Sequence, residues 1–396
     1  MMKIAYIDPY PVPDYRVASL QAVQMIDAMA RNGCLVHMVS PVSLLTADTF
    51  LGRDINKNVS FTGLKNIRKK WFFPFNSQKI FNHQVSTWLR KNSVDAIFTR
   101  NLKMAHYLLR KHPQIPCFFE GHEVFSQSFR ESHDLQNPKN QRKLTKLLKI
   151  EAMVYRHCAA VFVKTPLIKE DIIKIYHIDT PIYVTPNGVD LLAAQAQEKT
   201  QDLTRCNDET RVLYLGSLHP WKGLPTIIHA LPLLKSVRLY VAGGKPEQIA
   251  VLENLANKLG VSSRISFMGY IEPVKRFEVI ENADICVLPL TDSSMGGRYT
   301  SPLKLFEYMA MKKPIVISDL PSIRSVIDDD LVEFATSGNA ASFANAIEHI
   351  IDNPNHAKEK TNKAFSFILG KFNWDKCAKE TLDIIQSTLD KHSKLI

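Results

Sequence analysis

Short apolar runs alternate with helix-forming segments along this 396-residue sequence, and they do so in two successive series. The first series predicts strands at 3–7, 35–39, 95–99, 117–120 and 159–164, and the second at 211–215, 238–242, 265–268, 285–288 and 314–317. Helical spacing fills the intervals, for example at 19–31, 102–111, 225–234, 247–259 and 303–311. Such alternation indicates parallel sheets covered by helices on both faces. We therefore predict an α/β protein with two doubly wound, Rossmann-like domains.

The boundary between the two domains is predicted near residues 185–190, a turn-rich Thr-Pro-Asn-Gly-Val-Asp segment that follows a strand. We expect residues 1–186 to form the first domain and residues 187–371 the second, because one ordinary core is too small for this length. Doubly wound sheets bind ligands at the carboxyl ends of their strands, so we expect the site in a central cleft that both domains face.

Positive charge is concentrated in the first half of the sequence. Residues 1–186 hold 26 Lys and Arg against 14 Asp and Glu, whereas the remaining residues hold 24 against 25. This asymmetry indicates an anionic partner, for which lipid headgroups, a phosphorylated acceptor or nucleic acid qualify, with general solubility as the alternative. Residues 67–75 mix cations with aromatic side chains, which suits an anionic membrane surface. Residues 139–149 have a basic amphipathic pattern, although their leucines would equally fill a core.

Nucleic acid is not expected as a partner, because no binding motif accompanies the charge. The sequence has no apolar run long enough to span a membrane, and its start predicts a buried strand rather than a signal peptide. The six cysteines are scattered without a CxxC pair, which agrees with a reducing compartment. We predict a cytoplasmic protein, with peripheral attachment to the cytoplasmic membrane as an open alternative.

The glycine-rich segment Gly216-Ser217-Leu218-His219-Pro220-Trp221-Lys222-Gly223 follows a predicted strand and precedes a predicted helix. Glycine lets the backbone approach a ligand, and a helix N-terminus offers unpaired N–H groups and partial positive charge. Lys222 adds a cation that can meet a diphosphate. The order is not that of a P-loop, and a surface turn with a solvated lysine would fit the segment as well.

A second segment, residues 301–310, begins with Ser301-Pro302 and carries Glu307 on the predicted helix. Pro302 suits a first helical turn, and the N–H groups after it can face phosphate. The carboxylate of Glu307 can accept two hydrogen bonds from a ribose diol. An exposed helix glutamate is the alternative.

Four segments, at 216–223, 241–244, 267–270 and 301–310, occur together in an order and spacing that resemble the retaining GT-B glycosyltransferases of family 4. The resemblance is strong over residues 185–330 and weaker over the first half. Residues 186–190 resemble the family's interdomain passage. Residues 372–396 resemble its final helix, which returns to the N-terminal domain. The resemblance implies an acceptor on the first domain and a UDP- or GDP-linked sugar on the second.

The resemblance assigns roles by position. Lys222 would contact the donor diphosphate, Glu307 would hold the ribose, and His122 would lie beside the transferred sugar, which makes these three the catalytic candidates. Backbone groups of Leu303 to Leu305 would meet phosphate, with Lys304 between them. The other donor-binding candidates are Arg16, Gly216, Ser217, Gly244, Tyr270, Arg298, Tyr299 and Ser301.

Two of these positions depart from the family pattern. Ser217 stands where the family often has an arginine for phosphate, and Arg298, Lys304 or His219 could substitute for it. Tyr299 stands where the family commonly has a glutamate for the donor sugar, and residues 296–301 could supply backbone and hydroxyl contacts instead. After the first strand, residues 11–19 replace the family's glycine pair.

The resemblance implies transfer with retention of configuration, and helix termini with Lys222 can stabilise the departing diphosphate without a metal ion. Asp328-Asp329-Asp330 matches a DxD metal motif, but its position predicts an exposed turn. We expect no cofactor beyond the donor substrate, and a glycan, lipid-linked or other surface-polysaccharide acceptor. Two alternatives stay open, a catalytically inactive nucleotide-sugar-binding or partner protein and a sugar-nucleotide epimerase, both with the GT-B fold.

Overall fold

The computed structural model describes residues 1–66, 78–196 and 209–393, so the basic aromatic segment 67–75 lies outside the described residues. The chain folds as two compact units. Unit 1 comprises residues 1–186 and 374–396, and unit 2 comprises residues 187–373.

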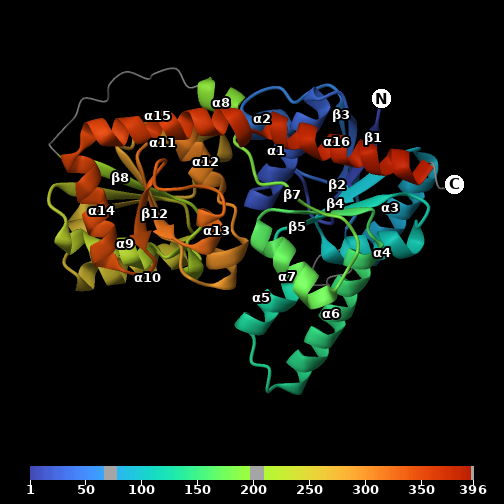
Figure 1. The fold of residues 1–396 in the computed structure, drawn as a ribbon, viewed down its shortest axis with the longest axis horizontal. Helices are drawn as coiled ribbons and strands as arrows, with labels where there is room; N and C mark the ends of the chain where they lie inside the picture. Colours follow the sequence, from blue (N-terminus) through green and yellow to red (C-terminus); the bar gives the residue numbers. More distant parts are fainter. Residues whose placement is uncertain (67–77, 197–208, 394–396) are drawn as a thin grey trace. The chain divides into compact units, whose positions relative to one another are not determined.

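Unit 1 is built on a parallel sheet of seven strands in the order β3-β2-β1-β4-β5-β6-β7 (Figure 1). The strands are β1 (Lys3–Ile7), β2 (Leu35–Pro41), β3 (Val59–Leu64), β4 (Ala96–Thr99), β5 (Cys117–Gly121), β6 (Ala160–Val163) and β7 (Ile182–Val184). Strands β4, β5 and β6 are buried along their whole length, which explains their continuous apolar sequences. The edge strand β3 exposes much of its surface, so its sequence lacks an apolar run and did not predict a strand.

The helices of unit 1 are α1 (Val17–Arg31), α2 (Ala47–Leu51), α3 (Lys79–Lys91), α4 (Leu102–Lys111), α5 (Phe125–Ser132), α6 (Pro138–His157), α7 (Pro166–Tyr176) and α16 (Trp374–Ser393). Local sequence fixes several of their starts. The side chains of Asn101 and Thr165 accept the N–H groups of Met104 and Ile168, which caps α4 and α7. Helices α5 and α6 extend away from the sheet (Figure 1).

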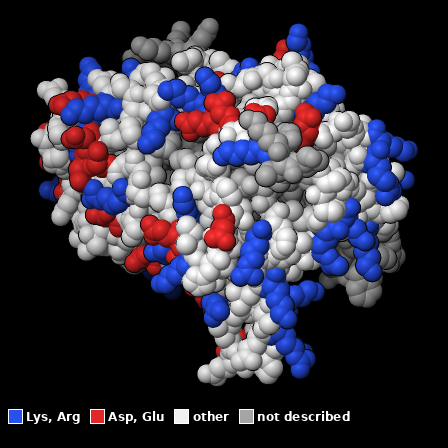
Figure 2. Space-filling view, turned by 45° about the vertical axis from the view of Figure 1, so that its right-hand side comes forward, with Lys and Arg blue, Asp and Glu red and all other residues white. Residues whose placement is uncertain are grey.

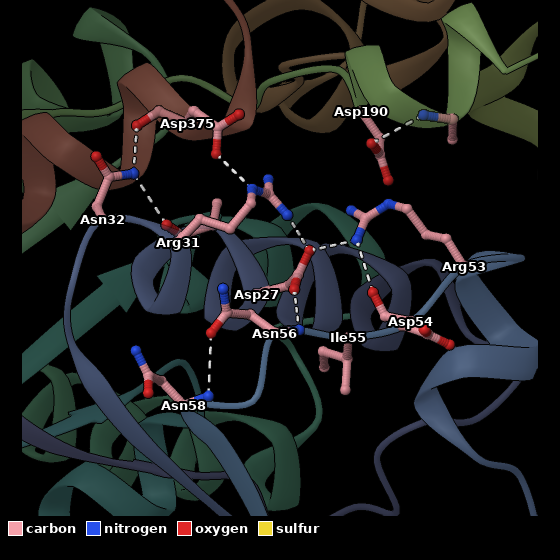
Figure 3. Close-up of polar contacts among 12 residues, drawn as sticks. Asp27, Arg31, Asn32, Arg53, Asp54, Ile55, Asn56, Asn58, Asp190 and Asp375 are labelled. Atoms are coloured by element: carbon pink, nitrogen blue, oxygen red, sulfur yellow. Dashed lines mark hydrogen bonds and ion pairs between the residues drawn. The ribbon is translucent and has the colours of Figure 1, made fainter.

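Helix α16 packs beside α1, far from it in sequence. Its buried side chains include Trp374, Cys377, Ala378, Leu382 and Ile385, which share one helical face. A polar network adds to this packing (Figure 3). Asp375 accepts a hydrogen bond of 2.7 Å from Arg31 on α1, and Arg31 also pairs with the buried Asp27.

Unit 2 is built on a parallel sheet of six strands in the order β10-β9-β8-β11-β12-β13. The strands are β8 (Thr210–Leu215), β9 (Val237–Ala242), β10 (Ile265–Gly269), β11 (Ile285–Leu288), β12 (Ile315–Asp319) and β13 (Glu333–Thr336). The short edge strand β13 was not predicted, because only one of its four residues is buried. In both sheets the strand order reverses in the middle, between β1 and β4 and between β8 and β11. The predicted α/β class with two doubly wound sheets is confirmed.

The helices of unit 2 are α8 (Leu191–Gln195), η1 (Pro220–Lys222), α9 (Leu224–Ala230), η2 (Leu231–Leu233), α10 (Pro246–Lys258), η3 (Ser262–Arg264), η4 (Pro273–Lys275), α11 (Arg276–Glu281), η5 (Ser294–Tyr299), α12 (Leu303–Ala310), α13 (Pro321–Arg324), α14 (Ala340–Asp352) and α15 (Pro354–Lys371). Helix α12 is nearly enclosed, and its Phe306 stacks on Phe372 with ring centroids 4.9 Å apart. Within the described ranges of both units, no helix is long and apolar enough to cross a membrane.

Candidate functional site

The segment that follows β8 lies at the point where the strand order of unit 2 reverses, the usual ligand position in a doubly wound sheet. It runs from Gly216 to Gly223 and is fastened to the segment that follows β11. The backbone N–H and the hydroxyl of Thr291 donate to the Trp221 carbonyl over 3.0 and 3.2 Å. A Cβ at Gly223 would lie 1.7 Å from the Pro289 carbonyl oxygen, and its φ is +69°. Glycine is therefore required at 223.

A second glycine shapes the same region from the strand beside it. Gly244, just after β9, has φ +91°, and a Cβ there would lie 2.2 Å from a methyl carbon of Leu218. Gly216 donates its N–H to the Ala242 carbonyl over 2.9 Å. Ser217 uses its carbonyl to accept the Tyr214 hydroxyl at 2.6 Å. These contacts hold the backbone of 216–218 in place, so the candidates Gly216, Ser217 and Gly244 lie together.

Lys222 stands in η1 with its ammonium 4.0 Å from the centre of the Trp221 ring. Burial and the nearby positive charge of Lys304 lower the pKa of Lys222 to about 8. Lys304 lies in the first turn of α12, so the structure brings together two candidates that are 82 positions apart in the chain. Two neighbouring cations repel each other, and an anionic ligand relieves that repulsion.

Glu307 lies on α12 and is held by two cations. Its Oε1 is 3.0 Å from Nε of Arg276, and its Oε2 is 2.6 Å from Nζ of Lys304. The side chains of Arg276 and Glu307 are each only 2% exposed. This group contains one carboxylate, that of Glu307, and three cations, namely Arg276, Lys304 and Lys222. The four side chains together therefore carry an excess of two positive charges. Such a group suits a diphosphate beside a hydroxyl-bearing nucleoside.

Arg276 was not among the residues predicted from the sequence. It is the first residue of α11, where it is buried with Phe277 and Ile280. A cation on an apolar helix face is the signal that could have found it, because a buried arginine needs a partner. Its partner is 31 positions away on another helix, and no local pattern predicts that pairing.

The segment 294–301 uses many of its polar groups internally. The N–H groups of Gly296 and Gly297 donate to the side chain and carbonyl of Ser293, over 3.1 and 2.6 Å, and the Gly296 carbonyl accepts the Ser322 hydroxyl at 2.8 Å. Tyr299 is 3% exposed and belongs to the core. The sequence analysis considered these backbone groups as contacts for a donor sugar, but both N–H groups and the Gly296 carbonyl instead make hydrogen bonds that shape η5.

The remaining donor-side candidates have distinct surroundings. Ser301 accepts two hydrogen bonds from Asn187, at its hydroxyl over 3.3 Å and at its carbonyl over 2.7 Å. Arg298 is half-buried in η5, and Leu303 and Leu305 are buried in the first turn of α12. Tyr270, after β10, is half-exposed.

His122 follows β5 in unit 1, at the carboxyl edge of the sheet. Its Nε2 lies 3.2 Å from a carboxylate oxygen of the buried Glu120, and Lys164, just after β6, pairs with the other oxygen. The Tyr6 hydroxyl donates to Glu120 over 3.4 Å, and Lys164 donates to the Thr185 carbonyl over 3.2 Å. Of these side chains the sequence predicted only His122. Charged residues at the ends of buried strands are the signal for Glu120 and Lys164.

Burial controls the charge states of this cluster. Burial and the nearby Arg100 lower the pKa of His122 to about 4, so the imidazole is neutral near pH 7. Burial opposes ionisation of Glu120, but Lys164 and His122 hold the pKa of its carboxyl well below the usual range. The cluster therefore presents a neutral imidazole beside a compensated ion pair.

Arg16 also lies in unit 1, as the residue before α1. Its Nε pairs with Asp14 at 2.6 Å, its Nη2 donates to the Pro11 carbonyl over 3.1 Å, and the guanidinium lies 4.5 Å from the Tyr10 ring centre. These contacts stabilise the loop that replaces the family's glycine pair.

The triplet Asp328-Asp329-Asp330 lies between α13 and β13. Asp329 pairs with Arg324 at 2.7 Å, and Asp328 accepts the N–H of Asp330 over 3.1 Å. Arg324 also contacts Asp319 through two nitrogens and covers the Phe334 ring. Asp328 and Asp329 therefore make their polar contacts within this exposed turn and with Arg324 beside it. In the described part of the chain, no three His, Cys, Asp or Glu side chains are grouped as metal ligands.

Two family models match the sequence. One, described as "Glycosyl transferases group 1", matches residues 209–353, and the other, "Glycosyltransferase Family 4", matches residues 18–191. The first match lies within unit 2, and the second lies mostly within unit 1 and ends at residue 191 of unit 2.

Curated relatives match the chain over part of their length. A D-inositol 3-phosphate glycosyltransferase of Xylanimonas cellulosilytica is 26% identical over 231 residues, which cover 54% of this chain and 54% of the relative. A phosphatidyl-myo-inositol mannosyltransferase of Mycobacterium leprae is 24% identical over 217 residues, covering 53% and 54%. The chain thus spans about half the length of these relatives.

Among solved structures, HepE of Anabaena in complex with UDP-glucose superposes with a TM-score of 0.74. The match covers 98% of this chain and 100% of HepE at 16% identity. This likeness concerns the fold of the whole chain.

Proposed function

Because the chain belongs to the GT-B glycosyltransferases of family 4, we propose that it transfers a sugar from a nucleotide-sugar to a glycan, lipid-linked or other surface-polysaccharide acceptor. One observation carries the proposal. Lys222, in the segment at the switch point of the unit 2 sheet, lies near Lys304, and Lys304 and Arg276 pair with Glu307, so the four side chains carry an excess of two positive charges. A nucleoside diphosphate offers the matching anion and a diol for the carboxylate.

In the proposed complex Lys222 and Lys304 bind the diphosphate, and Glu307 accepts hydrogen bonds from the ribose. Charge accumulates on the diphosphate as the sugar leaves, and the two fixed cations stabilise it without reorganisation. The UDP-glucose complex of HepE supports a nucleotide-sugar as donor. We propose a UDP- or GDP-linked sugar. We propose that the reaction needs no metal ion, and the internal pairing of Asp329 removes one reason to invoke a DxD site.

His122 acts in the proposal as a neutral hydrogen-bonding group beside the transferred sugar. Burial and Arg100 place its pKa at about 4, which excludes a role as a proton donor from imidazolium near pH 7. We propose a retaining reaction in which the acceptor hydroxyl attacks from the side of the departing diphosphate. Its proton passes to that diphosphate.

For the acceptor side, we propose that the basic face of α6 meets an anionic membrane surface. Five exposed cations lie on one face of this helix, namely Lys139, Arg142, Lys143, Lys146 and Lys149. Figure 2 shows Lys and Arg side chains along the projecting part of unit 1. The phosphatidyl-myo-inositol mannosyltransferase among the relatives supports a lipid-linked acceptor. A cytoplasmic location is proposed with it, and the buried free cysteines are compatible with a reducing compartment.

Donor turnover tests the proposal. Purified protein is incubated with UDP- and GDP-sugars, with and without lipid and saccharide acceptors, and the released nucleoside diphosphate is measured. We expect release that depends on an acceptor, and strong loss of donor binding in Lys222→Ala and Glu307→Ala. Nucleotide binding without consumption of any donor would favour a binding protein, and conversion of the donor sugar without acceptor would favour an epimerase.

A further inference from the structure

We propose that Arg276 is a positioning residue that fixes the carboxylate of Glu307 for the ribose, while Lys304 leaves that carboxylate for the diphosphate when the donor binds. The inference rests on the proposed nucleotide-sugar site and assigns different tasks to the two cations that hold Glu307. Its basis is the difference between these cations in burial, in anchoring and in unused hydrogen-bonding capacity.

The two contacts use separate oxygens of Glu307. Arg276 donates from Nε to Oε1 over 3.0 Å, and Lys304 donates from Nζ to Oε2 over 2.6 Å. A carboxylate has about four acceptor positions, so two remain when both cations are bound. Departure of Lys304 frees a third. A ribose diol needs two acceptors, and Arg276 keeps the carboxyl plane fixed while the diol binds.

Arg276 is anchored in a way that Lys304 is not. Its side chain is 2% exposed, its Nη1 donates to the Pro273 carbonyl over 2.6 Å, and its guanidinium covers the Phe277 ring at 4.2 Å. The Lys304 side chain is 23% exposed and lies near Lys222. A flexible ammonium at the edge of the site can exchange one anion for another, whereas an enclosed and anchored guanidinium cannot.

Arg276 also retains an unused donor. Its Nη2 is enclosed and finds no hydrogen-bond partner among the residues that the structure describes. Arg264 in the same unit shows what a packing arginine does, because its three nitrogens donate to the carbonyls of Val237, Leu231 and Leu234 over 3.1, 2.8 and 3.0 Å. An unmade hydrogen bond on a buried group destabilises the fold, so the spare donor of Arg276 indicates a site rather than a packing role.

The test compares UDP with 2′-deoxy-UDP by calorimetry, or GDP with 2′-deoxy-GDP if the protein prefers guanine. The ratio of the two dissociation constants measures recognition of the ribose and is insensitive to the diphosphate. We expect the wild type to bind the deoxy form on the order of tenfold more weakly, as one hydrogen bond to a charged group implies. In Arg276→Met this ratio falls toward one.

The matched variants separate the two tasks. Lys304→Met should weaken both nucleotides by a similar factor and keep the ratio. Arg276→Lys should keep part of the ratio, because an ammonium still pairs with Glu307. Arg264→Met controls for lost packing and should lower the melting temperature with the ratio unchanged. The double variant Arg276→Met with Glu307→Gln removes both buried charges and replaces Arg276→Met in the test if that single variant does not fold. In the double variant we expect a ratio of the two dissociation constants near one.

Two results would overturn the assignment. A wild-type ratio that persists in Arg276→Met, or in the double variant, would show that Arg276 and Glu307 do not recognise the ribose. A ratio lost in Lys304→Met but kept in Arg276→Met would reverse the two roles. A wild type that binds no nucleoside diphosphate would instead remove the proposed donor site, and the inference with it.

Discussion

At the scale of single residues, the candidate sites are built from charged groups withdrawn from water. Arg276 and Glu307 in unit 2, and Lys164 and Glu120 in unit 1, compensate each other's charge, whereas Lys222 lies beside the like charge of Lys304. The sequence predicted Lys222, Glu307 and His122 because they sit in recognisable segments. It did not predict Arg276 or Lys164, because their partners come from other strands and helices.

The lowered pKa of Lys222 predicts that donor binding at the proposed site depends on pH. With a pKa of about 8, Lys222 is mostly charged at pH 7 and mostly neutral at pH 9. The affinity for UDP or GDP should therefore fall above pH 8, by up to about tenfold per pH unit. Lys222→Arg, which stays charged, should show a flat profile over the same range. Calorimetry from pH 7 to 9 measures this, and a flat wild-type profile would contradict the assignment of Lys222 to the diphosphate.

His122 should remain neutral across the physiological range. Its pKa is lowered from 6.5 to about 4, so between these two pH values the unfolded chain binds a proton at His122 and the folded chain does not. The contribution of His122 to stability is therefore complete above pH 6.5 and declines as the pH falls toward 4. We expect the NMR signals of labelled His122 to stay constant between pH 8 and 5. A titration midpoint near 6.5 would show that burial and Arg100 do not lower the pKa of His122.

At the scale of elements, the apolar runs predicted the interior strands well, because parallel strands are buried on both faces. The edge strands β3 and β13 were not predicted, since few of their side chains are fully buried and their sequences follow no such pattern. The irregular η5 was also not predicted, because it depends on Ser293 and Ser322 meeting Gly296. Element boundaries near the site depend on such contacts between segments rather than on local propensity.

Gly223 offers a sharp test of how the segment after β8 is packed. Gly223→Ala must hold a left-handed backbone and also place a methyl group against the Pro289 carbonyl. Gly260→Ala is the matched control, because Gly260 has the same φ of +69° but open space around it. The control should cost about 1–2 kcal/mol of unfolding free energy, as a left-handed residue does, and Gly223→Ala should cost more. Equal losses in chemical denaturation would contradict the described packing at Gly223.

Charge reversal on helix α6 tests whether its basic face binds an anionic membrane surface. Lys143→Glu with Lys146→Glu reverses two exposed charges on its basic face. Sedimentation with vesicles containing anionic lipid should drop strongly, since each basic residue contributes about 1 kcal/mol near such a surface. Lys235→Glu with Lys258→Glu makes the same charge change on exposed positions of unit 2 and should leave binding unchanged. Equal binding by both double variants would count against α6 as the contact surface.

At the scale of the whole molecule, two sheets of the same doubly wound type each reverse their strand order once. The sequence predicted this plan because alternating strand and helix patterns leave few other topologies. It did not predict the contacts that fasten α16 beside α1, where Arg31 bridges Asp27 and Asp375 (Figure 3). Those contacts join residues more than 340 positions apart and become visible only in the folded chain.

The central claim is that Lys222, Lys304, Arg276 and Glu307 form the donor site, and a crystal structure with bound UDP or GDP tests it most directly. We expect the diphosphate to lie against Lys222 and Lys304, with the ribose hydroxyls on Glu307 and Arg276 still bonded to that carboxylate. A nucleotide bound elsewhere in the chain, or a ribose that makes no contact with Glu307, would contradict the claim.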